Sequence, residues 1–330
     1  MKRRALVTGA TGGLGRTLVP ALLDAGYQVT ATGRNAAIGA ALEVDGAAFI
    51  AADLCDASAD VLRGGADVVF HLAALSSPWG RRSDFAAINV GATRRLLDGA
   101  RSSGCGTFIY ASTPSIYVEP RDRLALTEQD PPARRFANHY AATKYEAERL
   151  VLAANDEDFR TMAIRPRAVV GPDDDVLLPR LIRASRGGRM PVPNGGNALI
   201  ELTDVRDAAA AFIAADGARE QAGGRAFNVS GGQPRRLRDL LQLIFAAIGS
   251  APRLVSLPAG PAMAAAWLAE RVAAMLPGRP EPPATRYTIM ALGFSQTFDL
   301  TAARQWLDWT PKFSPEEAIA FALQRRPPDD

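Results

Sequence analysis

A glycine-rich turn near the start of the chain constrains the fold more than any other feature. Residues 5–7 form a short apolar run, Gly9, Gly12 and Gly15 follow at three-residue spacing, and apolar residues then recur at helical spacing. This order predicts a strand, a tight turn and a helix. The glycines allow an anion to approach the backbone, and the first helical turn offers unpaired N–H groups, so we expect a dinucleotide pyrophosphate there. The candidate cofactor-binding residues of the turn are Gly9, Thr11, Gly12, Gly13, Leu14 and Gly15.

The composition is that of a globular protein with more than one core. The chain has 330 residues, 48% of them hydrophobic and 22% charged. Its net charge of +3 is spread along the sequence, so we expect no nucleic-acid partner. Cys55 and Cys105 lack metal or redox spacing, which predicts no metal site and favours the cytoplasm. The apolar stretch 261–276 is interrupted by charges at 270 and 271, so no membrane span is expected.

Strand and helix patterns alternate after the first turn. Residues 27–32, 47–52, 66–70 and 106–111 have strand character, and residues 85–102 have helical character. This alternation predicts an α/β fold with a Rossmann-type doubly wound parallel sheet and a smaller C-terminal substrate domain. We expect residues 1–170 to form the dinucleotide-binding domain, with 202–230 returning to it. Residues 171–201 and 231–330 are expected to form the substrate-binding domain.

The end of the second predicted strand bears on the choice of cofactor. NAD sites place an acid there, whereas an arginine can pair with the 2′-phosphate of NADP. Here Gly33 takes the place of the acid and Arg34 follows, so NADP is expected and NAD stays possible. The alternative for Arg34 is an exposed loop side chain. After the third strand, Asp53 beside Leu54 can accept from an adenine amino group or can cap the next helix, and the small Ala73 would let a cofactor pass close to the sheet.

Residues 138–148 predict a helix that carries chemistry. Tyr140 and Lys144 are four residues apart and therefore share one helix face. A cation beside a phenol favours phenolate, so we expect Lys144 to lower the pKa of Tyr140 and to make it a general acid/base near neutral pH. Thr113, at the end of the strand 106–111, offers a hydroxyl that can hold a substrate oxygen beside the phenol.

The order and spacing of these motifs resemble the extended short-chain dehydrogenase/reductase family over nearly the whole chain. The matching elements are Thr8-Gly9-x-x-Gly12-x-x-Gly15, Asp53-Leu54, His71-x-Ala73-Ala74, Asn89 before Val90-Gly91, Ser112-Thr113, Tyr140-x-x-x-Lys144 and Arg165-Pro166. The resemblance implies that Tyr140 is the general acid/base, that Lys144 binds the nicotinamide ribose, that Thr113 is the catalytic Ser/Thr, and that Arg165 belongs to the cofactor-binding set. It also implies hydride transfer between nicotinamide and a C–OH or C=O carbon.

Three departures separate this chain from the sugar-nucleotide branches of the family. Pro114-Ser115 stands where dehydratases carry Asp-Glu, and Ala168 stands where sugar-nucleotide enzymes carry an asparagine. The stretch 257–276 is apolar where a nucleotide sugar would need polar contacts. The chain looks most like 3β-hydroxysteroid dehydrogenase-like proteins and 2-alkyl-3-oxoalkanoate reductases. A secondary alcohol/ketone oxidoreductase on a bulky apolar, steroid-like or 3-oxoacid-like substrate is therefore expected. A sugar-nucleotide epimerase with tightly bound NAD and a catalytically silent NAD(P)-binding regulatory protein are the alternatives.

Two further expectations concern surfaces. The stretch 257–276 could form an amphipathic helix whose Met263, Trp267, Val272 and Met275 face inward, either in ordinary core packing or toward an apolar ligand. Arginines near the predicted site are expected on the surface, although one could meet a substrate carboxylate; they are Arg134, Arg135, Arg180 and Arg183. The resemblance also makes a homodimer possible.

Overall fold

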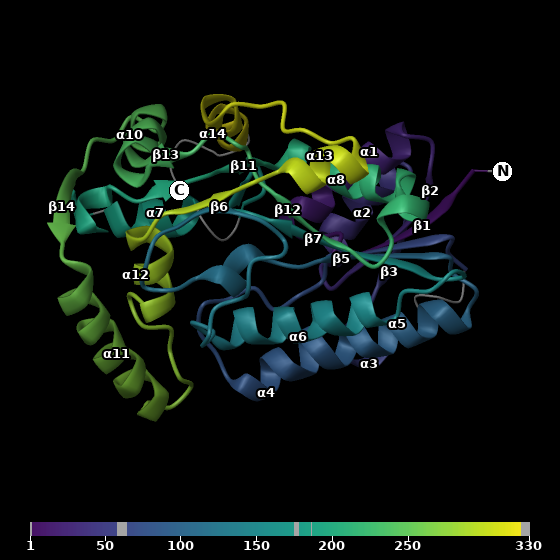
Figure 1. Ribbon diagram of the computed structural model, residues 1–330, viewed down its shortest axis with the longest axis horizontal. Helices are drawn as coiled ribbons and strands as arrows, with labels where there is room; N and C mark the ends of the chain where they lie inside the picture. Colours follow the sequence, from purple (N-terminus) through teal and green to yellow (C-terminus); the bar gives the residue numbers. More distant parts are fainter. Residues whose placement is uncertain (1, 58–64, 175–177, 186, 325–330) are drawn as a thin grey trace.

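The computed structural model describes residues 2–57, 65–174, 178–185 and 187–324. Its centre is a seven-stranded parallel sheet in the order β12-β7-β5-β4-β1-β2-β3 (Figure 1). The strands are β1 (Arg4–Thr8), β2 (Gln28–Gly33), β3 (Ala48–Ala51), β4 (Val68–His71), β5 (Thr107–Ala111), β7 (Arg160–Pro166) and β12 (Ala226–Val229). The order reverses between β1 and β4, and ligands of open α/β sheets bind at such a point. The predicted Rossmann-type doubly wound sheet is confirmed.

Helices cover both faces of the sheet because its strands are apolar on both sides (Figure 1). One face is covered by α1 (Gly13–Asp24), α2 (Ala36–Val44), α8 (Val205–Gly217), α9 (Arg219–Ala222) and α13 (Thr301–Leu307). The other is covered by α3 (Leu54–Ala57), α4 (Arg82–Phe85), α5 (Thr93–Ser102) and α6 (His139–Ala153). The helix expected at residues 85–102 contains a π-helical segment, Ala86–Ala92, whose buried Asn89 donates to Thr143 of α6 at 3.1 Å.

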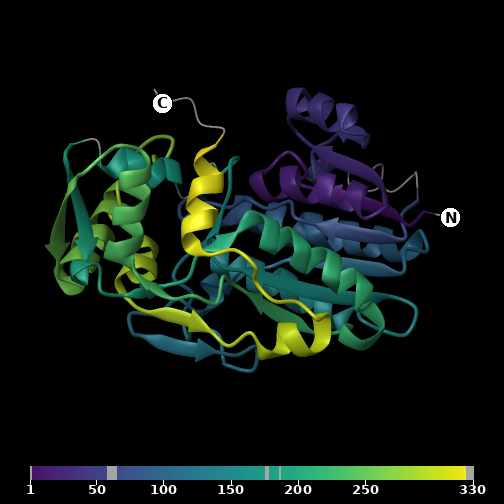
Figure 2. The same cartoon turned by 90° about the horizontal axis from the view of Figure 1, so that it is seen from above.

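A smaller lobe stands beside the carboxyl ends of the strands (Figure 2). Its helices are α7 (Leu178–Ser185), α10 (Leu237–Ala247), α11 (Ala259–Met275), α12 (Arg286–Gly293) and α14 (Pro315–Leu323). Its strands are β8 (Val169–Val170), β9 (Arg189–Pro193), β10 (Leu199–Ile200), β11 (Thr203–Asp204), β13 (Arg235–Arg236) and β14 (Arg253–Leu257). A separate core of side chains from these elements, including Met190, Leu240 and Phe245, holds the lobe together.

The chain passes between the lobes more than once. From α8 onward the chain returns to the sheet, where β12 pairs with β7 and α8 packs against α1. After the smaller lobe, β15 (Gln296–Phe298) pairs with β6 (Arg123–Leu126), and Phe298, Leu307 and Trp309 join the core beside the sheet. Residues 296–309 thus pack with the larger lobe although the sequence assigned 231–330 to the smaller one. Residues 325–330 of that expected domain lie outside the described ranges.

Candidate active site

A cleft of about 1180 Å³ lies between the two lobes. Its floor is made by loops that leave the carboxyl ends of β1, β2, β4, β5 and β7, which is where the sheet topology places a ligand. Its opposite wall comes from α7, α10, α12 and the residues just before α12. This volume is larger than that of most single small-molecule sites.

The glycines of the first turn have separate tasks. Gly9 has φ +68°, and a Cβ there would lie 2.6 Å from the backbone nitrogen of Ala73, so a side chain at Gly9 is excluded by both conformation and contact. A Cβ at Gly15 would lie 2.5 Å from Ala10 Cα, so this glycine allows the helix to pack against the strand. At Gly12 a Cβ would meet only Gly9 O, at 3.4 Å, and this residue opens α1. The turn therefore leaves space beside the helix N-terminus, as a pyrophosphate requires.

The end of β2 lacks an acid for a structural reason. Gly33 is buried, and a Cβ there would lie 2.5 Å from Thr11 Oγ1. Arg34 follows as an exposed side chain that lines the cleft. Asp53 lines the same part of the cleft and also accepts from Cys55 N at 2.8 Å, so it caps α3 and faces the cleft at once. Leu14, Leu54 and Ala73 line the cleft as well.

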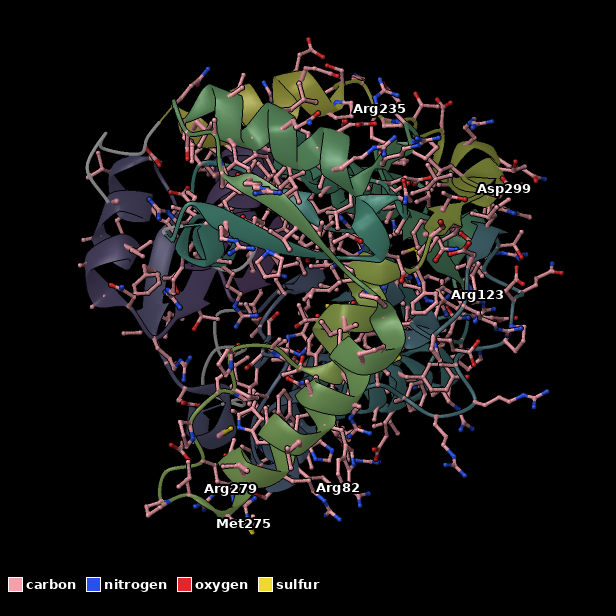
Figure 3. The ribbon with its side chains drawn as sticks, turned by 90° about the vertical axis from the view of Figure 1, so that its left-hand side faces the viewer. Arg82, Arg123, Arg235, Met275, Arg279 and Asp299 are labelled. Atoms are coloured by element: carbon pink, nitrogen blue, oxygen red, sulfur yellow. The ribbon has the colours of Figure 1, made fainter. Side chains whose placement is uncertain are left out.

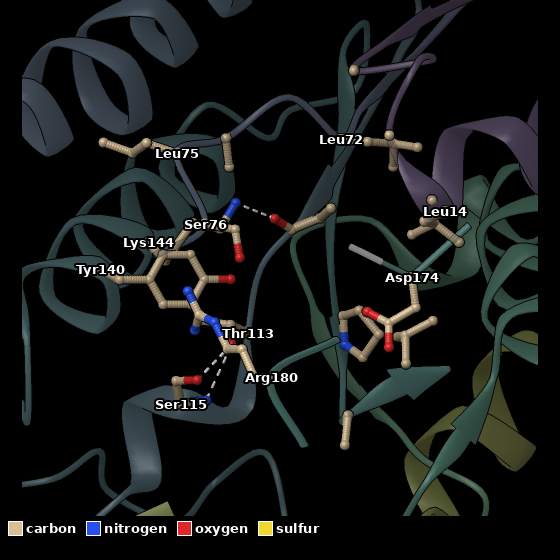
Figure 4. Close-up of a pocket in the computed structure, with 18 of the residues that line it drawn as sticks. Leu14, Leu72, Leu75, Ser76, Thr113, Ser115, Tyr140, Lys144, Asp174 and Arg180 are labelled. Carbon is tan, nitrogen blue, oxygen red and sulfur yellow. Dashed lines mark hydrogen bonds between the residues drawn. The ribbon is translucent and has the colours of Figure 1, made fainter. Parts of the chain in front are cut away.

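Helix α6 carries Tyr140 and Lys144 into the cleft. The Asn138 side chain caps the helix by accepting from Ala141 N at 2.9 Å, which fixes the start of the helix two residues before Tyr140. Figure 4 shows the Tyr140 ring with its hydroxyl directed toward Ser76 and Thr113. The structure thus brings together the three predicted catalytic residues and adds Ser76, which no sequence motif had indicated.

The electrostatics of Tyr140 differ from the expectation. Burial raises its pKa to about 12, and hydrogen bonding to Thr113 and Ser76 lowers it only in part. Lys144 is not among the groups that shift this pKa; its Nζ donates to the carbonyl of Ala111 and lies 4.0 Å from the centre of the Tyr110 ring. The prediction that Lys144 makes Tyr140 acidic is therefore wrong for the protein alone. Tyr140 is a neutral phenol at physiological pH.

Lys144 is itself strongly perturbed. Only 1% of the residue is exposed. Burial lowers its pKa to about 7, although Glu148, one turn further along the helix, favours the charged form. A buried lysine in a cleft with such a shift is typical of a functional residue.

Thr113 belongs to a chain of hydroxyl groups that links the lobes. Its Oγ1 accepts from Ser115 N at 3.2 Å and donates to Ser115 Oγ at 3.0 Å (Figure 4). Ser115 Oγ in turn lies 2.7 Å from the hydroxyl of Tyr287 on α12. Ser112, beside Thr113, has a buried Oγ that lines the cleft without a hydrogen-bond partner among the described residues. Tyr287 could not be found from the sequence because 172 residues separate it from Ser115.

Arg165 is not part of the cleft lining, which corrects its assignment to the cofactor set. Its guanidinium forms a buried ion pair with Glu148, with Nε 2.8 Å from Oε2 and Nη2 2.5 Å from Oε1, and it also donates to Tyr117. This pair joins β7 to α6 beneath the catalytic residues. Arg165 therefore supports the helix rather than a ligand.

The remaining predictions concern the arginines near the site and the apolar stretch 257–276. Arg134 and Arg135 are exposed. Arg180 and Arg183 line the cleft, and Arg180 forms an ion pair with Glu281 at 3.2 Å. On α11, Met263 packs against the small core of Ala259, Ala266 and Ile289, as expected. Trp267, Val272 and Met275 are 46%, 46% and 78% exposed, so the expectation that they face inward is wrong for these three. Figure 3 shows Met275 at the outer end of this helix. No helix of the described segments has both the length and the apolar character needed to cross a membrane.

Comparisons with known proteins agree with this geometry. Residues 5–230 match the NAD dependent epimerase/dehydratase family. The chain is 35% identical to a 2-alkyl-3-oxoalkanoate reductase of Stenotrophomonas maltophilia, over 96% of this chain and 97% of the relative. It is 32% identical to a 4-hydroxy-2-methyl-3-oxo-4-farnesyl-3,4-dihydroquinoline-1-oxide ketoreductase of Stigmatella aurantiaca, over 98% and 97%. Among solved structures, MoeE5 in complex with UDP-glucose and NAD superimposes with a TM-score of 0.76 at 26% identity, covering 97% of each chain.

Proposed function

The chain belongs to the NAD dependent epimerase/dehydratase family and is an NAD(P)-dependent oxidoreductase of CH–OH groups. From this premise we propose that it reduces a ketone on a bulky apolar substrate to a secondary alcohol. The observation that carries the proposal is the neutral Tyr140 hydroxyl, which lies beside Thr113 between a dinucleotide cleft and an apolar wall. A steroid-like or 3-oxoacid-like molecule has the required shape and polarity.

The residues of the larger lobe fit a nicotinamide dinucleotide. The open space at Gly12 and the N-terminus of α1 suit the pyrophosphate, and Asp53 and Arg34 stand where the adenosine half would lie. When bound, the cofactor supplies the hydride. Lys144, with the unpartnered Ser112 hydroxyl nearby in the lining, is the candidate for the nicotinamide ribose. Arg34 together with the missing acid favours NADP over NAD.

Tyr140 supplies the proton of the reduction. As the carbonyl carbon gains hydride, negative charge develops on its oxygen, and the Tyr140 O–H bond breaks to form the new alcohol O–H. Thr113 and Ser76 flank the phenol and orient the same oxygen. A phenol with a pKa of about 12 holds its proton at neutral pH, so it has the proton that reduction requires.

The wall that faces Tyr140 supports an apolar substrate. The aliphatic cleft residues of the smaller lobe are Leu181, Met190, Ile200, Leu202, Leu237, Leu240, Leu241 and Ile244. They are at most 7% exposed, and the same wall also carries polar side chains such as Arg180, Arg183 and Tyr287. A hydrocarbon that reaches the aliphatic part gains about 25 cal/mol per Å² of buried surface, which favours an apolar substrate over a nucleotide sugar.

A substrate panel tests the proposal. We expect NADPH consumption with long-chain 3-oxoacids or hydrophobic cyclic ketones, and no turnover of nucleotide sugars. The control is the cofactor content of the purified protein, since an epimerase would retain NAD. Turnover of a nucleotide sugar with retained NAD would overturn the proposal, and cofactor binding without any turnover would favour the regulatory alternative.

A further inference from the structure

One buried cation of the cleft lacks a counter-ion. Arg167 follows β7 directly, lines the cleft and is only 7% exposed. Its Nη2 is 3.5 Å from the carbonyl of Ala291, a long contact, and its Nε has no hydrogen-bond partner among the described residues. No ion pair to Arg167 occurs in the ranges that the structure describes.

The backbone holds Arg167 in this place from two sides. Its N–H donates to Val229 O at 2.8 Å, and its carbonyl accepts from the Thr203 hydroxyl. The side chain therefore extends from a backbone position that is held rigidly, at the carboxyl end of β7, where the chain crosses toward the smaller lobe. A fixed origin and a free guanidinium are the properties of a ligand anchor.

Arg165, two residues earlier, is a buried arginine whose charge is balanced by an ion pair, and it serves as a comparison for Arg167. It makes two bonds to Glu148, whereas Arg167 makes none to a carboxylate. The groups that act on Arg167 electrostatically are Glu201 and Tyr287, and burial still lowers its pKa. The carboxylate of Glu201 is already engaged by the Ser230 hydroxyl and by Phe298 N, so it does not bind the guanidinium. A buried charge in this condition destabilises the fold unless a ligand compensates for it.

We propose that Arg167 binds an anionic group of the substrate, so that the enzyme acts on an oxo acid rather than on an uncharged ketone. The inference rests on the proposed function and names its substrate class. The anion site lies on the side of the catalytic hydroxyls, because Tyr287 both influences Arg167 and contacts Ser115, the partner of Thr113. A planar guanidinium binds a carboxylate through two parallel hydrogen bonds. The aliphatic wall then receives the rest of the molecule.

A matched substrate pair tests the charge requirement. 3-Hydroxydodecanoate and its methyl ester differ only in the acid group, and their oxidation with NADP⁺ avoids the instability of 3-oxoacids. We expect Arg167→Met to lower kcat/KM for the acid by about 100-fold and to leave the ester almost unchanged. Arg167→Lys should recover part of the loss. Arg253→Met is the control, because Arg253 is an exposed arginine on β14 that does not line the cleft. An equal effect of Arg167→Met on acid and ester would overturn the inference.

A second measurement does not depend on turnover. In the absence of substrate, Arg167→Met should unfold at the same or a higher temperature than the wild type, since it removes an uncompensated charge. Added 3-hydroxydodecanoate should raise the melting temperature of the wild type and not that of the variant. A variant that melts lower and still gains stability from the acid would contradict the proposal. If the wild type neither oxidises these alcohols nor reduces the corresponding ketones, the proposed function fails, and the melting shift still decides whether Arg167 binds the acid.

Discussion

At the scale of single residues, burial controls the two ionisable side chains that α6 brings into the cleft, Tyr140 and Lys144. Tyr140 and Lys144 could be placed on one helix face from their spacing alone. Their pKa values could not be predicted, because burial dominates both shifts and follows from the tertiary packing, and because Thr113 and Ser76, which bind the Tyr140 hydroxyl, lie outside α6. For the same reason, the cation that remains available to a substrate is Arg167, whereas Arg165 is neutralised by Glu148.

The pH dependence of reduction follows from Tyr140. Its pKa of about 12 keeps the phenol protonated, so turnover in the direction of reduction should change by less than about twofold between about pH 8 and pH 10. The measurement is kcat for ketone reduction over this range. A tenfold fall per pH unit within it would mean that the proton donor ionises early, contrary to the neutral phenol seen here.

Lys144 should leave a signature in stability. Its pKa is about 7 in the folded protein against 10.5 in the unfolded chain. Between these values the unfolded state binds the additional proton, so the free energy of unfolding rises with pH, by at most about 1.4 kcal/mol per unit; below pH 7 the penalty is constant. Denaturant titrations should show this rise in the wild type and a flatter profile in Lys144→Met. Identical slopes would place the lysine in a more polar environment than the structure does.

Arg34 provides the test of cofactor choice. Arg34→Ala should lower the affinity for NADPH by about tenfold to a hundredfold, because the variant loses a charge-assisted contact to the 2′-phosphate. Its affinity for NADH should change little. Fluorescence titration with both cofactors measures this. The half-buried Arg16, which already pairs with Asp173 at 2.9 Å, offers an arginine control on α1. An equal loss of affinity for both cofactors would show that Arg34 does not contact the 2′-phosphate.

At the scale of elements, the glycine turn and α6 form as the sequence predicts because local rules decide them: chain reversal, helix capping and close packing. The buried face of helix α11 was not predicted correctly. Apolar residues occur all around this helix, so their periodicity does not show which face packs against the rest of the lobe. The structure covers the side with Ala259, Ala266 and Ala273, spaced by seven residues, through which α11 packs near α12, and leaves Trp267 largely outside. The buried alanines allow α11 to pack close to α12, whereas the sequence predicted that the large apolar side chains would form this contact.

This packing predicts opposite responses at neighbouring positions of α11. Ala266→Leu should lower the free energy of unfolding by about 1–3 kcal/mol, because Ala266 is 4% exposed and the added atoms do not fit. Trp267→Gln should change it by less than about 0.5 kcal/mol. Urea titration of both variants is the measurement. A large loss in the tryptophan variant combined with a neutral alanine variant would reverse the assignment of the two helix faces.

At the scale of the whole molecule, function arises where two lobes meet. The alternation of strands and helices predicted the sheet, and its switch point predicted where the ligand lies. The pairing of distant segments could not be predicted, since Tyr287 on α12 reaches Ser115, and β15 returns to β6 from the other end of the chain. The cleft combines a polar floor with an aliphatic wall because each comes from a different lobe.

The central claim is that the Tyr140 hydroxyl donates the proton that completes ketone reduction in this cleft. Its most direct test is a single-turnover measurement of NADPH oxidation by wild type and Tyr140→Phe, with cofactor and substrate affinities measured in parallel. We predict that the variant binds both ligands as the wild type does and that the rate of hydride transfer falls by about 10²–10⁴-fold. A variant that transfers hydride at close to the wild-type rate would contradict the account.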